Sequence, residues 1–213
     1  MARDEATGHD KAGHDKAGHG EATQGKVDRI RDLLPEIAQI GDGNLREIVE
    51  SIWEQVWRES DWEELADIPK NPSAPAAPQR VENAWTLITH TRAVAQLSVT
   101  SAETIKTMHG IDYDHDSLLA LALLHDVSKV VEYVGTKDSI AKGPLGKLIQ
   151  HGVYGAFLMW QHGLSTEMVH GIISHTPSSR ILPQTHEALV VRYTDFLDTD
   201  SMMLDAGEEL YLS

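Results

Sequence analysis

Apolar residues recur at helical spacing through most of the chain. Two amphipathic segments occupy residues 27–66, and the same spacing continues from residue 80 onward. We predict the main helices near residues 81–108, 117–134, 145–162, 165–175 and 184–204. No part of the sequence shows a convincing strand-like alternation of apolar and polar residues. The pattern therefore predicts an all-α fold.

The most apolar stretch, Leu118 to Tyr133, contains His125 and Asp126. A helix that is apolar on every side is buried, and burying an imidazole beside a carboxylate is unfavourable unless another group binds them. A divalent metal ion offsets this penalty, because neutral histidine nitrogen and aspartate oxygen are both good ligands. Adjacent side chains diverge on a regular helix. A carboxylate that bridges two ions beside a histidine ligand would suit that divergence.

Four further polar residues fall within apolar patterns on the other predicted helices. His90 lies near the core-facing stripe of its helix, and His151 opens its helix beside small glycines that permit close backbone approach. His175 closes its helix, and Asp195 lies in a largely apolar one. The carboxylates that compete with Asp195 for this role are Asp198 and Asp200. One ligand group on each of five successive helices predicts a metal site, because such groups converge in a bundle core.

Composition narrows the function classes. The chain has 33 acidic residues against 18 basic ones and a net charge of −15, which argues against nucleic-acid and anionic-membrane partners. It has no cysteine, which excludes disulfides, thiolate metal sites and a cysteine nucleophile. The longest apolar run, residues 118–124, is too short to cross a bilayer, and the first residues do not resemble a secretory signal. We expect a cytoplasmic protein.

The sequence divides into four parts. Residues 1–26 are of low complexity and contain a repeated Gly-His-Asp-Lys-Ala unit, so we predict a disordered tail. Residues 27–66 form an N-terminal helical extension that contains three of the five tryptophans. Residues 67–79 have a proline at every third position, which is typical of an extended linker. Residues 80–213 form the main helical domain.

The order His90, His125-Asp126 and Asp195 resembles the HD-domain superfamily of metal-dependent phosphohydrolases. The resemblance covers about residues 80–200, and His125-Asp126-Val-Ser-Lys129 matches the family's HD-x-x-K form. The additional His151 and His175 resemble the dinuclear branch of the family. The HD-GYP signature of cyclic-di-GMP phosphodiesterases is absent. The resemblance implies an HD-domain helical bundle that follows the N-terminal extension.

The resemblance also implies a set of site residues. The first metal ion would be held by His90, His125, Asp126 and Asp195. The second would be held by His151 and His175, with Asp126 as the bridge. Two divalent ions, iron or manganese, are the expected cofactors. We expect Asp126 and Lys129 to be catalytic and a small anionic substrate to be bound by Lys129, Lys137, Lys142, Lys147 and Arg180.

These observations favour a dinuclear metal-dependent phosphohydrolase that acts on a small phosphate ester or nucleotide. The alternative is a mixed-valent di-iron HD-domain oxygenase, which resembles myo-inositol oxygenase and would act on a small polar or anionic substrate. The set of nitrogen and oxygen ligands suits iron as well as manganese. A third hypothesis is a metal-stabilised sensor or binding module without enzyme activity. A homo-oligomer is compatible with each of them.

Overall fold

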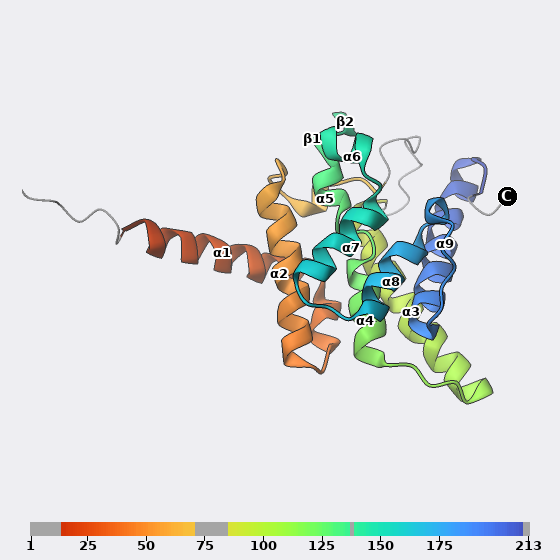
Figure 1. Cartoon of the computed structure of the whole chain (residues 1–213). Coiled ribbons are helices and arrows are strands. Elements are labelled where there is room, and N and C mark those ends of the chain that lie inside the picture. Colours follow the sequence, from red (N-terminus) through yellow and green to blue (C-terminus); the bar gives the residue numbers. More distant parts are fainter. Residues whose placement is uncertain (1–13, 71–84, 137–138, 211–213) are drawn as a thin grey trace, which may run out of the picture.

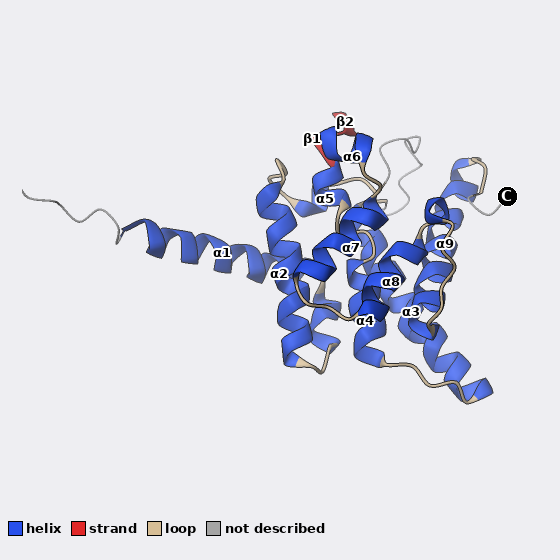
Figure 2. Cartoon of the chain, viewed as in Figure 1, coloured by secondary structure: helices blue, strands red, loops and turns tan. Residues whose placement is uncertain are grey.

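The structure is a computed structural model that describes residues 14–70, 85–136 and 139–210, with side chains from residue 24 onward. The chain is folded as an all-α bundle, which confirms the predicted fold class (Figures 1 and 2). The helices are α1 (His14–Leu33), α2 (Gly43–Glu59), α3 (Leu87–His109), α4 (His115–Leu124), α5 (Lys129–Glu132), α6 (Pro144–Leu148), α7 (His151–Gln161), α8 (Thr166–His175) and α9 (His186–Ala206). Three 3₁₀ turns accompany them, η1 (Pro35–Gln39), η2 (Leu65–Asp67) and η3 (Pro177–Ser179).

Helix α4 lies at the centre of the bundle. It contacts α3, α8 and α9 on one side and η1 and α2 on the other. Every residue from Leu118 to Leu124 is buried, as expected for a helix that is apolar all round. His125 and Asp126 come directly after this helix and are buried in the middle of the molecule.

The N-terminal extension packs on the centre of the bundle and shares its core. Trp53 is fully buried and donates its indole N–H to the carbonyl oxygen of Leu123 at 3.1 Å. Trp62 donates in the same way to Tyr133 at 3.1 Å. The two acceptor carbonyls, of Leu123 and Tyr133, lie on either side of His125 and Asp126 in the sequence. The extension therefore packs against the segment that carries these two residues and stabilises its position.

Helix α1 begins at His14, so a helix occupies residues 14–26, where the sequence predicted disorder. The segment runs without a break into residues 27–33, where Ile30 is buried and anchors the helix. Alanine, lysine and glutamate in the repeat favour helix once that anchor exists. The N-terminal part of α1 projects away from the bundle (Figure 1). Residues 1–13 and 71–84 lie outside the described residues, and the second range includes most of the predicted linker, 67–79.

The structure also contains an antiparallel hairpin that the sequence did not predict. Strand β1 (Tyr133–Thr136) pairs with β2 (Ser139–Lys142), and Tyr133 is opposite Lys142. Neither strand alternates strictly between apolar and polar residues, so the sequence carries no strand signal there. Gly135 has φ of 123°, and a Cβ there would lie 2.1 Å from the carbonyl oxygen of Ser139, so only glycine fits.

Two predicted helices are interrupted. The segment 145–162 is divided into α6 and α7 by Ile149 and Gln150, and the segment 117–134 ends as α4 at Leu124 before α5 begins at Lys129. Among the described residues, no helix combines the length and apolar character that a bilayer crossing requires.

Candidate metal centre

The local break after α4 positions the His-Asp pair. Residues 125–128 form turns in which the N–H of Val127 bonds the carbonyl of Leu124 at 3.2 Å and the N–H of Lys129 bonds that of Asp126 at 2.9 Å. These are i to i−3 bonds, tighter than those of an α-helix. We expected a regular helix to direct the two side chains apart. Instead, His125 Nε2 lies 3.4 Å from Asp126 Oδ2, so both side chains reach the same site.

A first group of candidate ligands joins α3, the turn and α9. His90 Nε2 lies 3.0 Å from His125 Nε2, 3.4 Å from Asp126 Oδ2 and 3.2 Å from Asp195 Oδ1. One ligand atom from each of these four residues falls within 4.8 Å of all the others. The four side chains are buried or nearly so. Their donor set, two imidazole nitrogens and two carboxylate oxygens, suits a divalent ion.

A second group joins the same aspartate to α7 and α8. His151 Nε2 and His175 Nε2 are 3.2 Å apart, and Asp126 Oδ1 lies 3.5 Å from the first and 3.6 Å from the second. Gly152 and Gly155 allow this approach, because a Cβ on either would come within 3.2 Å of Ile172 on α8. The structure therefore brings together all six residues that the sequence singled out as metal ligands.

Asp126 belongs to both groups and turns a different oxygen toward each. Its Oδ2 faces His90 and His125, while its Oδ1 faces His151 and His175. Oδ1 is buried and has no hydrogen-bond partner. A buried carboxylate oxygen without a donor is unfavourable, and a cation between Oδ1 and the two imidazoles would satisfy it. The residues present thus fit a pair of divalent ions bridged by Asp126.

The outward-facing nitrogens of the histidines support this arrangement. His125 Nδ1 and His175 Nδ1 lie 2.7 and 2.6 Å from the carbonyl oxygens of Ala122 and Ile172. His90 Nδ1 lies 2.6 Å from Asp198 Oδ2. A proton on Nδ1 donates to each of these acceptors and leaves the Nε2 electron pair free to bind a metal ion.

His151 is the fourth histidine, and its outer contact is looser. Its Nδ1 lies 3.9 Å from Glu132 Oε2, a buried carboxylate oxygen that has no hydrogen-bond partner. The other oxygen of Glu132 binds the ammonium of Lys142 at 2.9 Å. Glu132 is thus placed to orient the His151 ring through Nδ1, as the backbone carbonyls orient the rings of His125 and His175.

Burial and charge set the protonation of the cluster. Burial lowers the pKa of His125, and it lowers the pKa of His151 to about 3, so both imidazoles are neutral at neutral pH. Burial would also lower the pKa of His90, but hydrogen bonds to Asp126, Asp195 and Asp198 raise it to about 8.

The two carboxylates are ionised. Burial alone would raise their pKa values. Lys129 and His125 instead hold the pKa of Asp126 well below its usual range. His90 and Lys70 hold the pKa of Asp195 below its usual range. Both side chains therefore present negative oxygens at neutral pH.

The residues predicted to bind substrate are distributed unevenly. Lys129 is in the centre, with its Nζ 2.6 Å from Asp126 Oδ2. Lys142 binds Glu132, which in turn lies beside His151, and it has no described contact with the candidate ligands themselves. Lys147 on α6 and Arg180 after η3 are exposed, and no described contact joins either of them to the candidate ligands. Lys137 lies outside the described residues.

Besides Glu132, three residues of the centre were not predicted. Lys70 is buried and donates to Thr199 Oγ1, and Thr199 donates to Asp195 Oδ1 at 3.2 Å. The interaction of Asp198 with His90 was not foreseen either, although its position three residues after Asp195 places it on the same helix face. Sequence gave no comparable signal for Lys70, which belongs to the segment that we interpreted as a linker.

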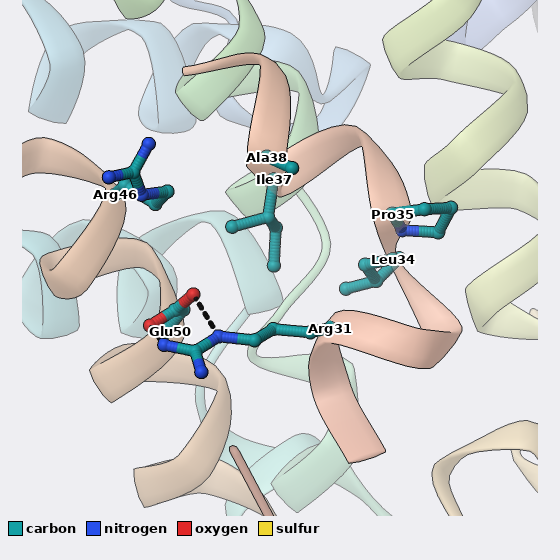
Figure 3. Close-up of a pocket in the computed structure, with 7 residues that line it drawn as sticks. All are labelled: Arg31, Leu34, Pro35, Ile37, Ala38, Arg46 and Glu50. Atoms are coloured by element: carbon teal, nitrogen blue, oxygen red, sulfur yellow. Dashed lines mark hydrogen bonds and ion pairs between the residues drawn. The ribbon is translucent and has the colours of Figure 1, made fainter. Parts of the chain in front are cut away.

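A separate pocket lies in the extension (Figure 3). It is lined by residues of α1, η1 and α2, and Glu50 holds the guanidinium of Arg31 there at 2.7 and 2.8 Å. Arg31 and Glu50 pair with each other, and Arg46 donates to the carbonyl oxygen of Ile40 at 3.0 Å. None of the residues that line the pocket belongs to the metal centre.

The fold and the ligand cluster define a helical bundle whose core could hold two metal ions. The sequence pattern of the HD domain matches residues 87–200, and the chain belongs to the HD-domain family. A dihydroneopterin 2',3'-cyclic phosphate phosphodiesterase from Methanocaldococcus jannaschii is 25% identical over 114 residues. That match covers 53% of this chain and 46% of the relative, so the chain spans less than half of the relative's length. No solved structure matches the chain significantly.

Proposed function

We propose that the protein is a dinuclear metal-dependent phosphohydrolase that acts on a small phosphate ester or nucleotide. The observation that carries the proposal is Asp126, whose two oxygens face separate ligand groups and whose Oδ1 has no protein donor. Membership of the HD-domain family supports metal-dependent chemistry at this motif. The name of the Methanocaldococcus relative supports a phosphate ester as the substrate class.

Two divalent ions held by the six ligands would orient a phosphoryl group, activate a water molecule and neutralise developing charge. The protein's own residues would hold this arrangement. Asp126 fixes the spacing of the two groups, and Asp198 and the carbonyls behind His125 and His175 fix the imidazole orientations. Lys129 places a permanent positive charge beside Asp126, where it would bind an oxygen of the substrate.

A mixed-valent di-iron oxygenase that acts on a small polar or anionic substrate is the second candidate. The donor set favours it as much as the hydrolase, because four imidazoles and two carboxylates without a thiolate accommodate iron well. The two functions differ in redox chemistry, so the identity and oxidation state of the bound metal distinguish them.

The test is metal analysis of freshly purified protein, with an electron paramagnetic resonance spectrum before and after partial reduction. Manganese, or a metal silent in the spectrum, together with release of phosphate from nucleotides or sugar phosphates would support the hydrolase. A mixed-valent di-iron signal that changes when a candidate substrate is added would overturn it in favour of the oxygenase.

A further inference from the structure

Lys70 reaches the metal centre from outside the HD domain. It lies in the segment that we interpreted as a linker, before the HD-domain match begins at residue 87. The backbone around it is pinned to the start of α3. Its N–H bonds the carbonyl of Trp85 at 2.8 Å, and the N–H of Leu87 bonds the carbonyl of Ile68 at 2.7 Å. His90 lies one turn further along that helix, so the position of Lys70 is coupled to that of a candidate ligand.

The side chain of Lys70 is almost fully buried, which is exceptional for lysine. Its ammonium donates to Thr199 Oγ1 and lies 3.8 Å from Asp195 Oδ1. Lys129 makes a closer contact with the other carboxylate of this group, since its ammonium donates directly to Asp126 Oδ2 at 2.6 Å. Two buried ammonium groups therefore lie beside carboxylates of the same ligand group, one from the segment before the HD-domain match and one from the HD motif.

The charges of the centre show what this pair of lysines is suited to bind. Asp126, Asp195 and Asp198 contribute three negative charges, and Lys70 and Lys129 contribute two positive ones. Two divalent ions would add four positive charges and leave three in excess. Uncompensated charge in a buried site is costly. A dianionic ligand removes two of the three charges, whereas a monoanionic ligand removes only one.

We propose that Lys70 is a substrate-binding residue and that, together with Lys129, it adapts this centre to a dianionic phosphate group, such as that of a phosphate monoester, in preference to a monoanionic phosphodiester. The proposal rests on the dinuclear metal site of the proposed function, but it does not require hydrolysis. It also gives the segment before the HD-domain match a role in substrate choice that the HD domain alone would lack.

Burial lowers the pKa of Lys70 to about 8, so the test is run below that pH, where its ammonium is mainly charged. It is calorimetric titration of the manganese-loaded full chain at about pH 7.5 with two probes. Inorganic phosphate is mainly dianionic there, and dimethyl phosphate is monoanionic. We expect phosphate to bind at least about ten-fold more tightly than dimethyl phosphate. Replacing Lys70 by methionine should weaken phosphate binding about ten-fold, as expected for the loss of a charged hydrogen bond, and weaken dimethyl phosphate binding less. Lys106→Met, at an exposed lysine paired with Asp112, is the matched control and should leave both affinities unchanged.

The same samples are analysed for metal content and helicity, which should not change in Lys70→Met. Lys70→Gln keeps a hydrogen-bond donor for Thr199 and serves as a second variant if the methionine variant is unstable. Equal affinity for the two probes, unchanged phosphate binding in the variants, or loss of metal or of folded protein in both variants would each overturn the proposal. Normal hydrolysis in Lys70 variants would reject this role of Lys70 and leave the proposed function intact. Lys70-dependent phosphate binding without hydrolysis of any ester would reject the proposed function instead.

Discussion

Asp126 is the residue on which both halves of the centre depend. Because its two oxygens face different histidine pairs, Asp126→Ala should reduce the metal content from two ions per chain to none. His151 belongs to the second group only, so His151→Ala should leave about one ion. Elemental analysis of the purified variants measures both, with the exposed His109→Ala as a control that keeps two. A parent protein with a single ion, or none, would contradict the dinuclear arrangement.

Substitution of Lys129 distinguishes a role of its buried charge in substrate binding from a role in folding. Its ammonium contacts Asp126 Oδ2, and that charge holds the pKa of Lys129 above its usual range. Lys129→Met keeps much of the apolar stem and removes the charge. We expect unchanged metal content and fold, with kcat/KM lowered by about 1–3 kcal/mol of transition-state stabilisation. Unchanged turnover, or loss of metal and structure, would show that Lys129 does not bind the substrate.

How far the site can be predicted from sequence differs from residue to residue. His125 and Asp126 were recognisable because two polar residues interrupt an apolar run. The other four candidate ligands lie at helix-sized intervals on either side of this pair: His90, His151, His175 and Asp195. The structure brings these six together, while their binding of metal stays a prediction. Lys70 could not be found in this way. Its burial arises from the pairing of residues 68–70 with 85–87, and no local pattern encodes that contact.

At the scale of elements, the sequence predicted helices well and their interruptions poorly. Apolar periodicity identifies a helix around residues 117–134, yet it does not show that the hydrogen bonding tightens at residues 125–128. The hairpin after α5 has four residues per strand and mixed polarity, which is below the reach of a period-two pattern. Both features lie beside the ligands. Regular helices could therefore be predicted from the sequence. The turn at residues 125–128 and the hairpin, which lie beside the candidate ligands, could not.

The close packing of α7 on α8 gives an element-scale prediction. A Cβ on Gly152 would lie 3.1 Å from Thr176 Cγ2 and 3.2 Å from the backbone oxygen of Ile172, which cannot move easily. Gly152→Val should therefore push α7 away from α8 and separate His151 from His175. We expect the second metal ion to be lost and the first retained, as measured by metal content. Gly25→Ala, where a Cβ meets nothing within 4 Å, is the control. Two ions in Gly152→Val would show that the second group tolerates the displacement.

At the scale of the whole molecule, the extension and the HD domain form one hydrophobic core. Residues of η1 and α2 pack with those of α3, α4 and α5 in a single cluster of buried side chains, and polar contacts cross the same boundary. Asp116 at the start of α4 accepts the N–H groups of Gly41 and Asp42 at 3.0 and 2.7 Å. We therefore expect the described part of the chain to unfold as one cooperative unit.

Trp53 provides the test of this cooperativity. Trp53→Ala would remove a fully buried indole from the extension and leave the carbonyl of Leu123 without its donor. The free energy of unfolding should fall by about 3–5 kcal/mol, and the metal centre should be lost in the same transition. Denaturant titrations followed by tryptophan fluorescence, circular dichroism and metal release should superimpose in the parent protein and in the variant. Trp160→Ala, at an indole that is 65% exposed, should shift the midpoint little. A fluorescence transition that precedes metal release would show instead that the extension unfolds independently and that its contacts with α4 do not support the site.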